Sequence, residues 1–97
     1  MGNKNIVTLG KGESVEWHGL WVQFEDAGQM DHSDGSKKGF VVLRLEAKGE
    51  RDEVVFAERN YGEPHEWMGY EITVHAEKGV EPREITIEAR FASAGSS

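Results

Sequence analysis

Apolar and polar residues alternate at every second position along most of the chain, and this pattern most constrains the fold. The clearest stretch is residues 84–91, which alternates polar residues with Ile85, Ile87, Ala89 and Phe91. Successive side chains of a β-strand point to opposite faces, so a period of two places these four residues on one inward face. No window of a dozen residues sustains an apolar stripe at helical spacing. The sequence therefore predicts an all-β protein.

Seven strands are predicted from this alternation and from the turn residues between the apolar runs. Their approximate bounds are residues 6–9, 13–17, 20–25, 40–48, 53–58, 68–76 and 84–91. Longer connections are expected at residues 28–38 and 60–66, which are rich in Gly, Asp, Ser or Pro. Short strands at regular spacing are typical of a small antiparallel β-sandwich, and a small β-barrel is the alternative. No internal repeat is predicted.

The length of the chain limits it to one domain. It has 97 residues, of which 37% are hydrophobic and 30% charged. Two separate cores would each bury too little surface at this length, so we expect a single domain over residues 1–92. Residues 93–97 read SAGSS, which is small and polar, and they are expected to form a flexible C-terminal tail.

Charge and residue types argue against several classes of function. The net charge of −7 repels phosphate backbones, so nucleic acid is not expected as a partner. No apolar run approaches the roughly 20 residues that span a bilayer, so direct membrane insertion is not expected. The chain has no cysteine, which excludes disulfides and thiolate metal sites. No nucleophile motif or phosphate-binding loop is present, and we expect a protein without catalytic residues.

The segment WHGLW at residues 17–21 predicts a tight β-hairpin with His18 and Gly19 at its turn. A two-residue turn places residue 17 opposite residue 20, and directly opposite residues share one face of the sheet. Trp17 is therefore predicted to point inward, and Trp21 is predicted to point outward.

An outward Trp21 beside an apolar strand predicts an exposed aromatic face. The expected members of this face are Trp21, Phe40, Val42, Glu16 and Arg44. Trp and Arg are frequent at binding hot spots, so the predicted function is a binding or protein-interaction module. A partner protein or a homodimer is the expected partner, and a carbohydrate-binding module is an alternative. In a further alternative, residues 28–38 or the second sheet cover Trp21.

Histidine and methionine residues in or beside the two long connections give another alternative. They are Met30, His32, His65 and Met68. Thioether and imidazole ligands suit Cu(I), so these residues predict a small copper-binding carrier. The stretch HEWM at residues 65–68 is similar to the combination of His, Met and Trp in the small periplasmic copper carriers of the CusF type. Copper belongs to this alternative alone, and the interaction module is expected to need no cofactor.

The order of short motifs between Lys11 and Val74 resembles the extracytoplasmic β domain of ResB-type cytochrome c assembly proteins. The matching residues are Gly12-Glu13-Ser14, Gly19 to Asp26, Asp34-Gly35, Phe40 to Leu45, Asn60 to Pro64 and Gly69-Tyr70. The resemblance implies an extracytoplasmic binding or scaffolding domain, and it carries over no catalytic residue.

Overall fold

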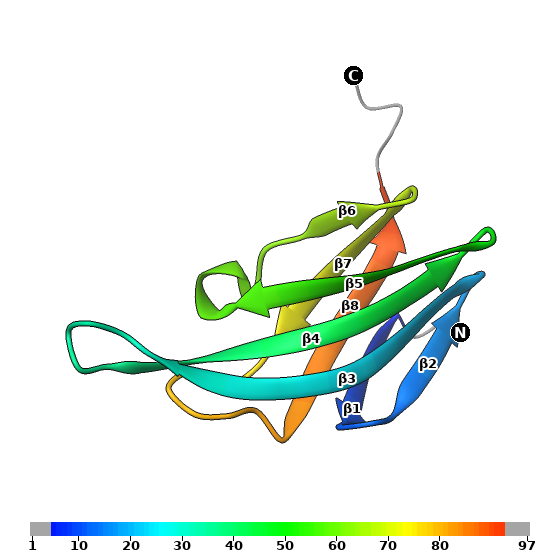
Figure 1. Cartoon of the computed structure of the whole chain (residues 1–97). Helices are drawn as coiled ribbons and strands as arrows, with labels where there is room; N and C mark the ends of the chain where they lie inside the picture. Colours follow the sequence, from blue (N-terminus) through cyan, green and yellow to red (C-terminus); the bar gives the residue numbers. More distant parts are fainter. Residues whose placement is uncertain (1–4, 93–97) are drawn as a thin grey trace.

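The computed structural model describes residues 5–92, and this part of the chain folds into two β-sheets. The eight strands are β1 (Ile6–Gly10), β2 (Ser14–Trp17), β3 (Leu20–Asp31), β4 (Lys37–Ala47), β5 (Glu50–Ala57), β6 (His65–Trp67), β7 (Tyr70–His75) and β8 (Glu84–Phe91). The first sheet has the order β1-β8-β7-β6, and the second sheet has the order β2-β3-β4-β5 (Figure 1). All neighbouring strands are antiparallel.

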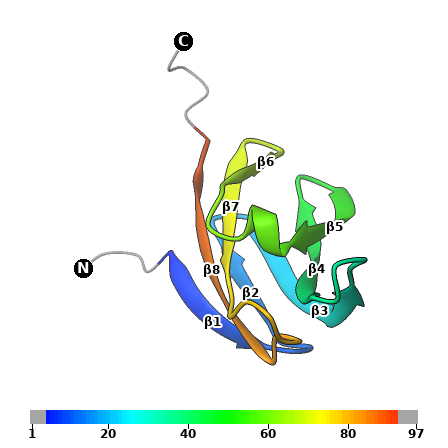
Figure 2. The ribbon, with the colours of Figure 1, turned by 90° about the vertical axis from the view of Figure 1, so that its left-hand side faces the viewer.

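The two sheets lie face to face, as Figure 2 shows, and neither closes into a barrel. The predicted all-β class and the two-sheet sandwich are therefore confirmed. The helical content of residues 5–92 is one 3₁₀ turn, η1 (Glu58–Asn60), so this part of the chain holds no helix that could cross a bilayer. The predicted tail at residues 93–97 lies outside the described residues.

The hydrophobic core lies between the sheets and consists of their inward-facing side chains. The largest fully buried residues are Leu20, Val22, Phe24, Val41, Leu43, Leu45, Phe56, Ile72, Val74, Ile85 and Ile87. Within each strand they occupy alternate positions, as the period of two predicted. The core therefore follows directly from the sequence pattern, because each strand buries one of its two faces.

The three tightest hairpins share one turn chemistry. The turns at His18-Gly19, Lys48-Gly49 and Met68-Gly69 all have positive φ angles at both residues. A type I′ turn requires this, and glycine adopts it at little cost. The first hairpin pairs Trp17 with Leu20 and Glu16 with Trp21, which confirms the predicted register and puts the two tryptophans on opposite faces.

Two edge hairpins have similar sequences, contrary to the expectation of no internal repeat. Residues 12–24 read GESVEWHGLWVQF, and residues 62–74 read GEPHEWMGYEITV. The first stretch forms the β2-β3 hairpin, and the second forms the β6-β7 hairpin. In each sheet the hairpin is continued by the next strand along the chain, β4 or β8. The sandwich therefore contains the same three-stranded unit twice.

Two predicted connections differ from the structure. The connection expected at residues 28–38 is mostly a two-stranded ribbon, in which Met30 pairs with Lys38 and Asp31 with Lys37. Only residues 32–36 form the turn. The connection expected at residues 60–66 ends in β6, and Met68 belongs to a turn instead of a strand. Backbone hydrogen bonding between strands tolerates polar side chains. The β3-β4 ribbon and β6 therefore lack the apolar alternation by which strands are predicted from sequence.

Candidate functional site

The outer face of the second sheet carries three adjacent apolar side chains, Phe40, Val42 and Val55, which we call the apolar strip. Val42 on β4 lies directly opposite Val55 on β5, and Phe40 lies opposite Ala57. Directly opposite residues have Cβ atoms about 5 Å apart, so the strip is continuous. Val55 is 60% exposed, and it is the most exposed large hydrophobic residue among residues 5–92.

The sequence builds this strip because β4 is apolar on both faces. Val41 and Leu43 fill the core, while Phe40 and Val42 point outward between them. The Phe40 ring lies across Gly28 on β3, where an added Cβ would come within 2.6 Å of the ring. The absence of a side chain at Gly28 therefore lets Phe40 lie flat on the sheet.

The outer face of the first sheet is mostly polar, in contrast to the apolar strip. Ile6 at the start of β1 is the one exposed large hydrophobic residue on this face among residues 5–92, and it lies among polar residues. The hydroxyl groups of Thr8 and Thr86 lie 3.1 Å apart on adjacent strands. Further along this face, Arg90 forms an ion pair with Glu71 at 3.4 Å. An antiparallel sheet with one solvated face normally shows such a polar set. The apolar strip is therefore a property of one side of the sandwich.

An ionic group borders the apolar strip on one side. The Arg44 guanidinium contacts the Glu25 carboxylate at 3.0 Å and the Glu53 carboxylate at 3.6 Å. A hydrogen bond with Glu53, together with burial, raises the pKa of Glu25 above its ordinary value, while Arg44 acts in the opposite direction. Two carboxylates thus share one cation, and the border of the strip carries negative charge.

The predicted aromatic face is divided in two by this ionic group. Phe40, Val42 and Arg44 lie next to one another on β4, as predicted. Trp21 is half-buried and pairs with Glu16 and Glu46 near the β2-β3 turn. About 13 Å of β4 separates Glu46 from Val42, and Arg44 lies between them. Trp21 and Glu16 therefore do not belong to the apolar strip.

Most of the aromatic contacts lie at the end of the sandwich that carries the tight turns. Trp17 contacts Phe91 with ring centroids 4.9 Å apart and Tyr70 at 6.2 Å. The Tyr70 hydroxyl donates a hydrogen bond of 2.7 Å to the carbonyl oxygen of His18. Phe91, predicted to point inward, is 58% exposed because it ends β8 at the rim of the core. This cluster joins the two sheets.

The four predicted copper ligands are not brought together. Met30 and His32 lie at the far end of the β3-β4 ribbon, whereas Met68 lies in the β6-β7 turn, where its carbonyl oxygen contacts Lys48. Figure 1 shows these regions at opposite ends of the molecule. His65 packs against the Phe56 ring at 5.6 Å. Within residues 5–92, no three His, Cys, Asp or Glu side chains are grouped to hold a metal ion.

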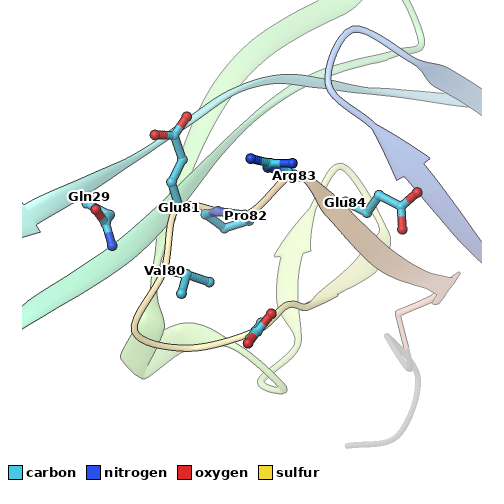
Figure 3. A pocket seen from close by; sticks show the side chains of 7 residues that line it. Gln29, Val80, Glu81, Pro82, Arg83 and Glu84 are labelled. Atoms are coloured by element: carbon cyan, nitrogen blue, oxygen red, sulfur yellow. The ribbon is translucent and has the colours of Figure 1, made fainter.

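Figure 3 shows an open pocket of about 880 Å³ beside the connection between β7 and β8. Its lining includes three glutamates and Arg83. The carboxylates of Glu81 and Glu84 point in different directions in this view, so they do not form a facing acid and base pair. Glu81 instead lies 3.8 Å from the Lys11 ammonium group.

Glu58 fixes this connection to the second sheet. Its carboxylate accepts hydrogen bonds from the backbone N–H groups of Gly39 on β4 and Gly79 in the connection. Beside Gly39, the Tyr61 hydroxyl is buried and has no hydrogen-bond partner among residues 5–92, and burial raises its pKa to about 12. The Glu58 side chain therefore holds together η1, β4 and the β7-β8 connection, which are distant from one another in the sequence.

Replacing Glu58 with Gln is expected to lower the melting temperature at neutral pH and to have a smaller effect in acid. The hydrogen bonds from Gly39 and Gly79 hold the pKa of Glu58 below its ordinary value of 4.5. A lowered pKa in the folded state stabilises the protein above pH 4.5, and this stabilisation is lost as the pH falls through the folded-state value. Thermal unfolding between about pH 3 and pH 7 measures the difference. If the difference in melting temperature between Glu58→Gln and the parent protein does not change with pH, the proposed role of the Glu58 carboxylate is wrong. Glu63→Gln is the control.

Comparison with family models, curated proteins and solved structures gives no match to this chain. A functional assignment must therefore rest on the geometry of its surfaces.

The sequence predicted Phe40, Val42 and Arg44 as neighbours on one face but did not predict Val55. The apolar run of Val54, Val55 and Phe56 on one strand was the signal that could have identified Val55. Glu58 gave no local signal, because its partners come from distant segments.

Proposed function

We propose that the protein is a non-enzymatic interaction module that binds a partner protein through the apolar strip. The observation that carries this proposal is the exposed Val55, directly opposite Val42, on the outer face of a sheet. Water-exposed sheet faces are normally polar, and contiguous apolar patches on soluble domains commonly mark binding surfaces. The mostly polar outer face of the first sheet supports a role specific to the second sheet.

The charge around the strip favours a different protein over a second copy of this chain. Three carboxylates lie beside the strip, but among residues 5–92 only two cations pair with them: Arg44 contacts Glu25 and Glu53, and Lys11 contacts Asp26 at 3.3 Å. Two copies that met through this face would bring like charges together, and each chain has a net charge of −7. The matching partner presents an apolar patch bordered by Lys or Arg side chains.

The flat shape of the strip also favours a protein over a small molecule. Phe40 lies across Gly28, so its ring rests on the sheet instead of forming the wall of a deep cleft, and the small hollow beside Val55 has a volume of only about 150 Å³. Small-molecule ligands bind in concave sites, whereas protein interfaces bury flat patches with an apolar centre and a polar rim. The strip and its ionic border have this arrangement.

Site-specific photocrosslinking in the native host tests the proposal. A photoreactive benzoylphenylalanine at position 55 is expected to give one main crosslinked product with a different protein. The same residue at position 86, on the polar face of the first sheet, is the matched control and is expected to give none. The partner, once identified and purified, is expected to bind at least about tenfold more weakly to a Val42→Thr, Val55→Thr double variant.

Three results would contradict this assignment. Equal crosslinking from positions 55 and 86 would indicate random collisions. A product with twice the mass of the chain would identify a second copy as the occupant. Unchanged affinity of the double variant, with its fold verified by circular dichroism, would place the interface elsewhere.

A further inference from the structure

A second hollow lies where β5 leaves the second sheet, next to the Phe40 end of the apolar strip, because its lining residue Ala57 is directly opposite Phe40. It has a volume of about 470 Å³, within the range of small-molecule sites. The β3-β4 ribbon supplies Met30 and Lys38, the end of β5 and η1 supply Ala57 and Arg59, and the β7-β8 connection supplies Lys78. Figure 1 shows these segments near the left-hand end of the molecule. We call this hollow the basic pocket.

The charge of the basic pocket is opposite to that of the whole protein. Its lining contains Lys38, Arg59 and Lys78 but only one carboxylate, that of Glu58. The chain has 11 Lys and Arg residues and a net charge of −7, so three cations around one hollow reverse the local sign. His32 also lines the pocket. An anionic ligand therefore meets a favourable field here, although most of the surface repels it.

Glu58 does not cancel this preference, because its carboxylate is already bound. It accepts the backbone N–H of Gly39 at 2.7 Å and the backbone N–H of Gly79. The same two bonds remove the backbone donors that could otherwise hold a bare phosphate group. Recognition of an anion is thus left to the side chains of Lys38, Arg59 and Lys78.

The remaining wall of the basic pocket is apolar. Met30 is 46% exposed, and Ala57 and Gly39 add further apolar surface. Methionine is flexible and adapts to ligands of different shape. An inorganic anion would leave this wall uncovered, whereas a molecule with an apolar body would cover it.

We infer that the basic pocket binds a small organic anion with an apolar body, such as a medium-chain carboxylate. The carboxylate contacts the side chains of Arg59, Lys78 and Lys38, and the apolar body lies against Met30 and Ala57. This site adjoins the Phe40 end of the apolar strip and differs from the proposed protein interface in its ligand. Variants distinguish the two, because Arg59 and Lys78 line the basic pocket alone, whereas Val42 and Val55 belong to the strip alone.

Titrations followed by two-dimensional NMR of the ¹⁵N-labelled protein test this inference with three probes. Octanoate has the proposed chemistry, octylammonium has the same apolar body with the opposite charge, and inorganic phosphate has charge without an apolar body. Octanoate is expected to give saturable shifts at the amides of residues 30, 38, 57–59 and 78. Octylammonium and phosphate are each expected to bind at least about tenfold more weakly, because charge-assisted contacts and apolar burial both contribute.

Matched variants locate the site. The Arg59→Ala, Lys78→Ala variant is expected to lose octanoate affinity by at least about tenfold, the effect of removing two charge-assisted contacts. The Arg51→Ala, Arg90→Ala variant removes the same charge from exposed surface pairs and is expected to bind octanoate as the parent does. Equal shifts with octylammonium would overturn the inference. So would tight binding of phosphate alone, octanoate shifts centred on Val42 and Val55, or no saturable shift.

Discussion

Replacing Phe24 with Ala is expected to lower the free energy of unfolding by about 3–5 kcal/mol. Phe24 has no exposed surface, and it lies directly opposite Leu43 in the middle of the second sheet. The next residue, Glu25, is part of a β-bulge, where the register between β3 and β4 shifts. Two costs add up in this loss: the removed aromatic ring no longer contributes the free energy of its burial, and the surrounding strands fill the resulting cavity only partly. Denaturant unfolding measures it.

Two other replacements serve as controls for Phe24→Ala. Phe24→Leu keeps most of the apolar volume and is expected to cost less than half as much. Val55→Ala removes an apolar side chain that is 60% exposed, and it is expected to leave stability almost unchanged. A similar small loss for all three variants would contradict the placement of Phe24 in the core. Small domains have unfolding free energies of about 5–15 kcal/mol, so Phe24→Ala is expected to remove a large fraction of the total.

Replacing Gly39 with Ala is expected to destabilise the protein by about 1–3 kcal/mol, an unusual cost for adding one methyl group to a strand. A Cβ atom at this position would lie 2.4 Å from the carbonyl oxygen of Val80. The obstacle is backbone, so it cannot rotate away. The neighbouring contacts resist a shift, because the Gly39 N–H is bound to Glu58, which also holds Gly79. Thermal unfolding measures the loss.

Gly10→Ala is the matched control for Gly39→Ala. Gly10 also lies in a strand, but its nearest obstacle is the carboxylate of Glu13 at 3.4 Å, the far end of a flexible side chain. The control is expected to change stability by less than about 1 kcal/mol. Hydrogen exchange at residues 76–83 is expected to become faster in Gly39→Ala only. Equal stability of the two variants would show that the connection between β7 and β8 does not press against Gly39.

Local rules account for most of the fold. The alternation at residues 84–91 predicted β8 and its buried Ile85 and Ile87, and both features are confirmed. The turn residues His18 and Gly19 were enough to predict the pairing of Trp17 with Leu20. In both cases the determining interactions lie within a few residues of each other, so a single sequence contains them.

Local rules fail where a strand is polar or very short. The β3-β4 ribbon continues to Asp31 although its sequence is typical of a loop, and β6 has only three residues. The similarity between residues 12–24 and 62–74 was a usable signal for β6, because the first stretch was already predicted as a hairpin. Residue Phe91 has the correct alternation for burial, but its place at the end of β8 leaves it exposed.

The sequence by itself determined the all-β class, the inward and outward sides of most strands and the position of the first hairpin. These properties depend on side-chain alternation and on turn residues, which act between near neighbours in the chain. Only the tertiary structure decided that Val55 joins Phe40 and Val42, that Arg44 separates Trp21 from them, and that Lys38, Arg59 and Lys78 meet at one hollow. These groupings depend on register, on the bulge at Glu25 and on contacts between distant segments. No single stretch of sequence specifies such contacts, because many arrangements of the same strands bury the same apolar faces.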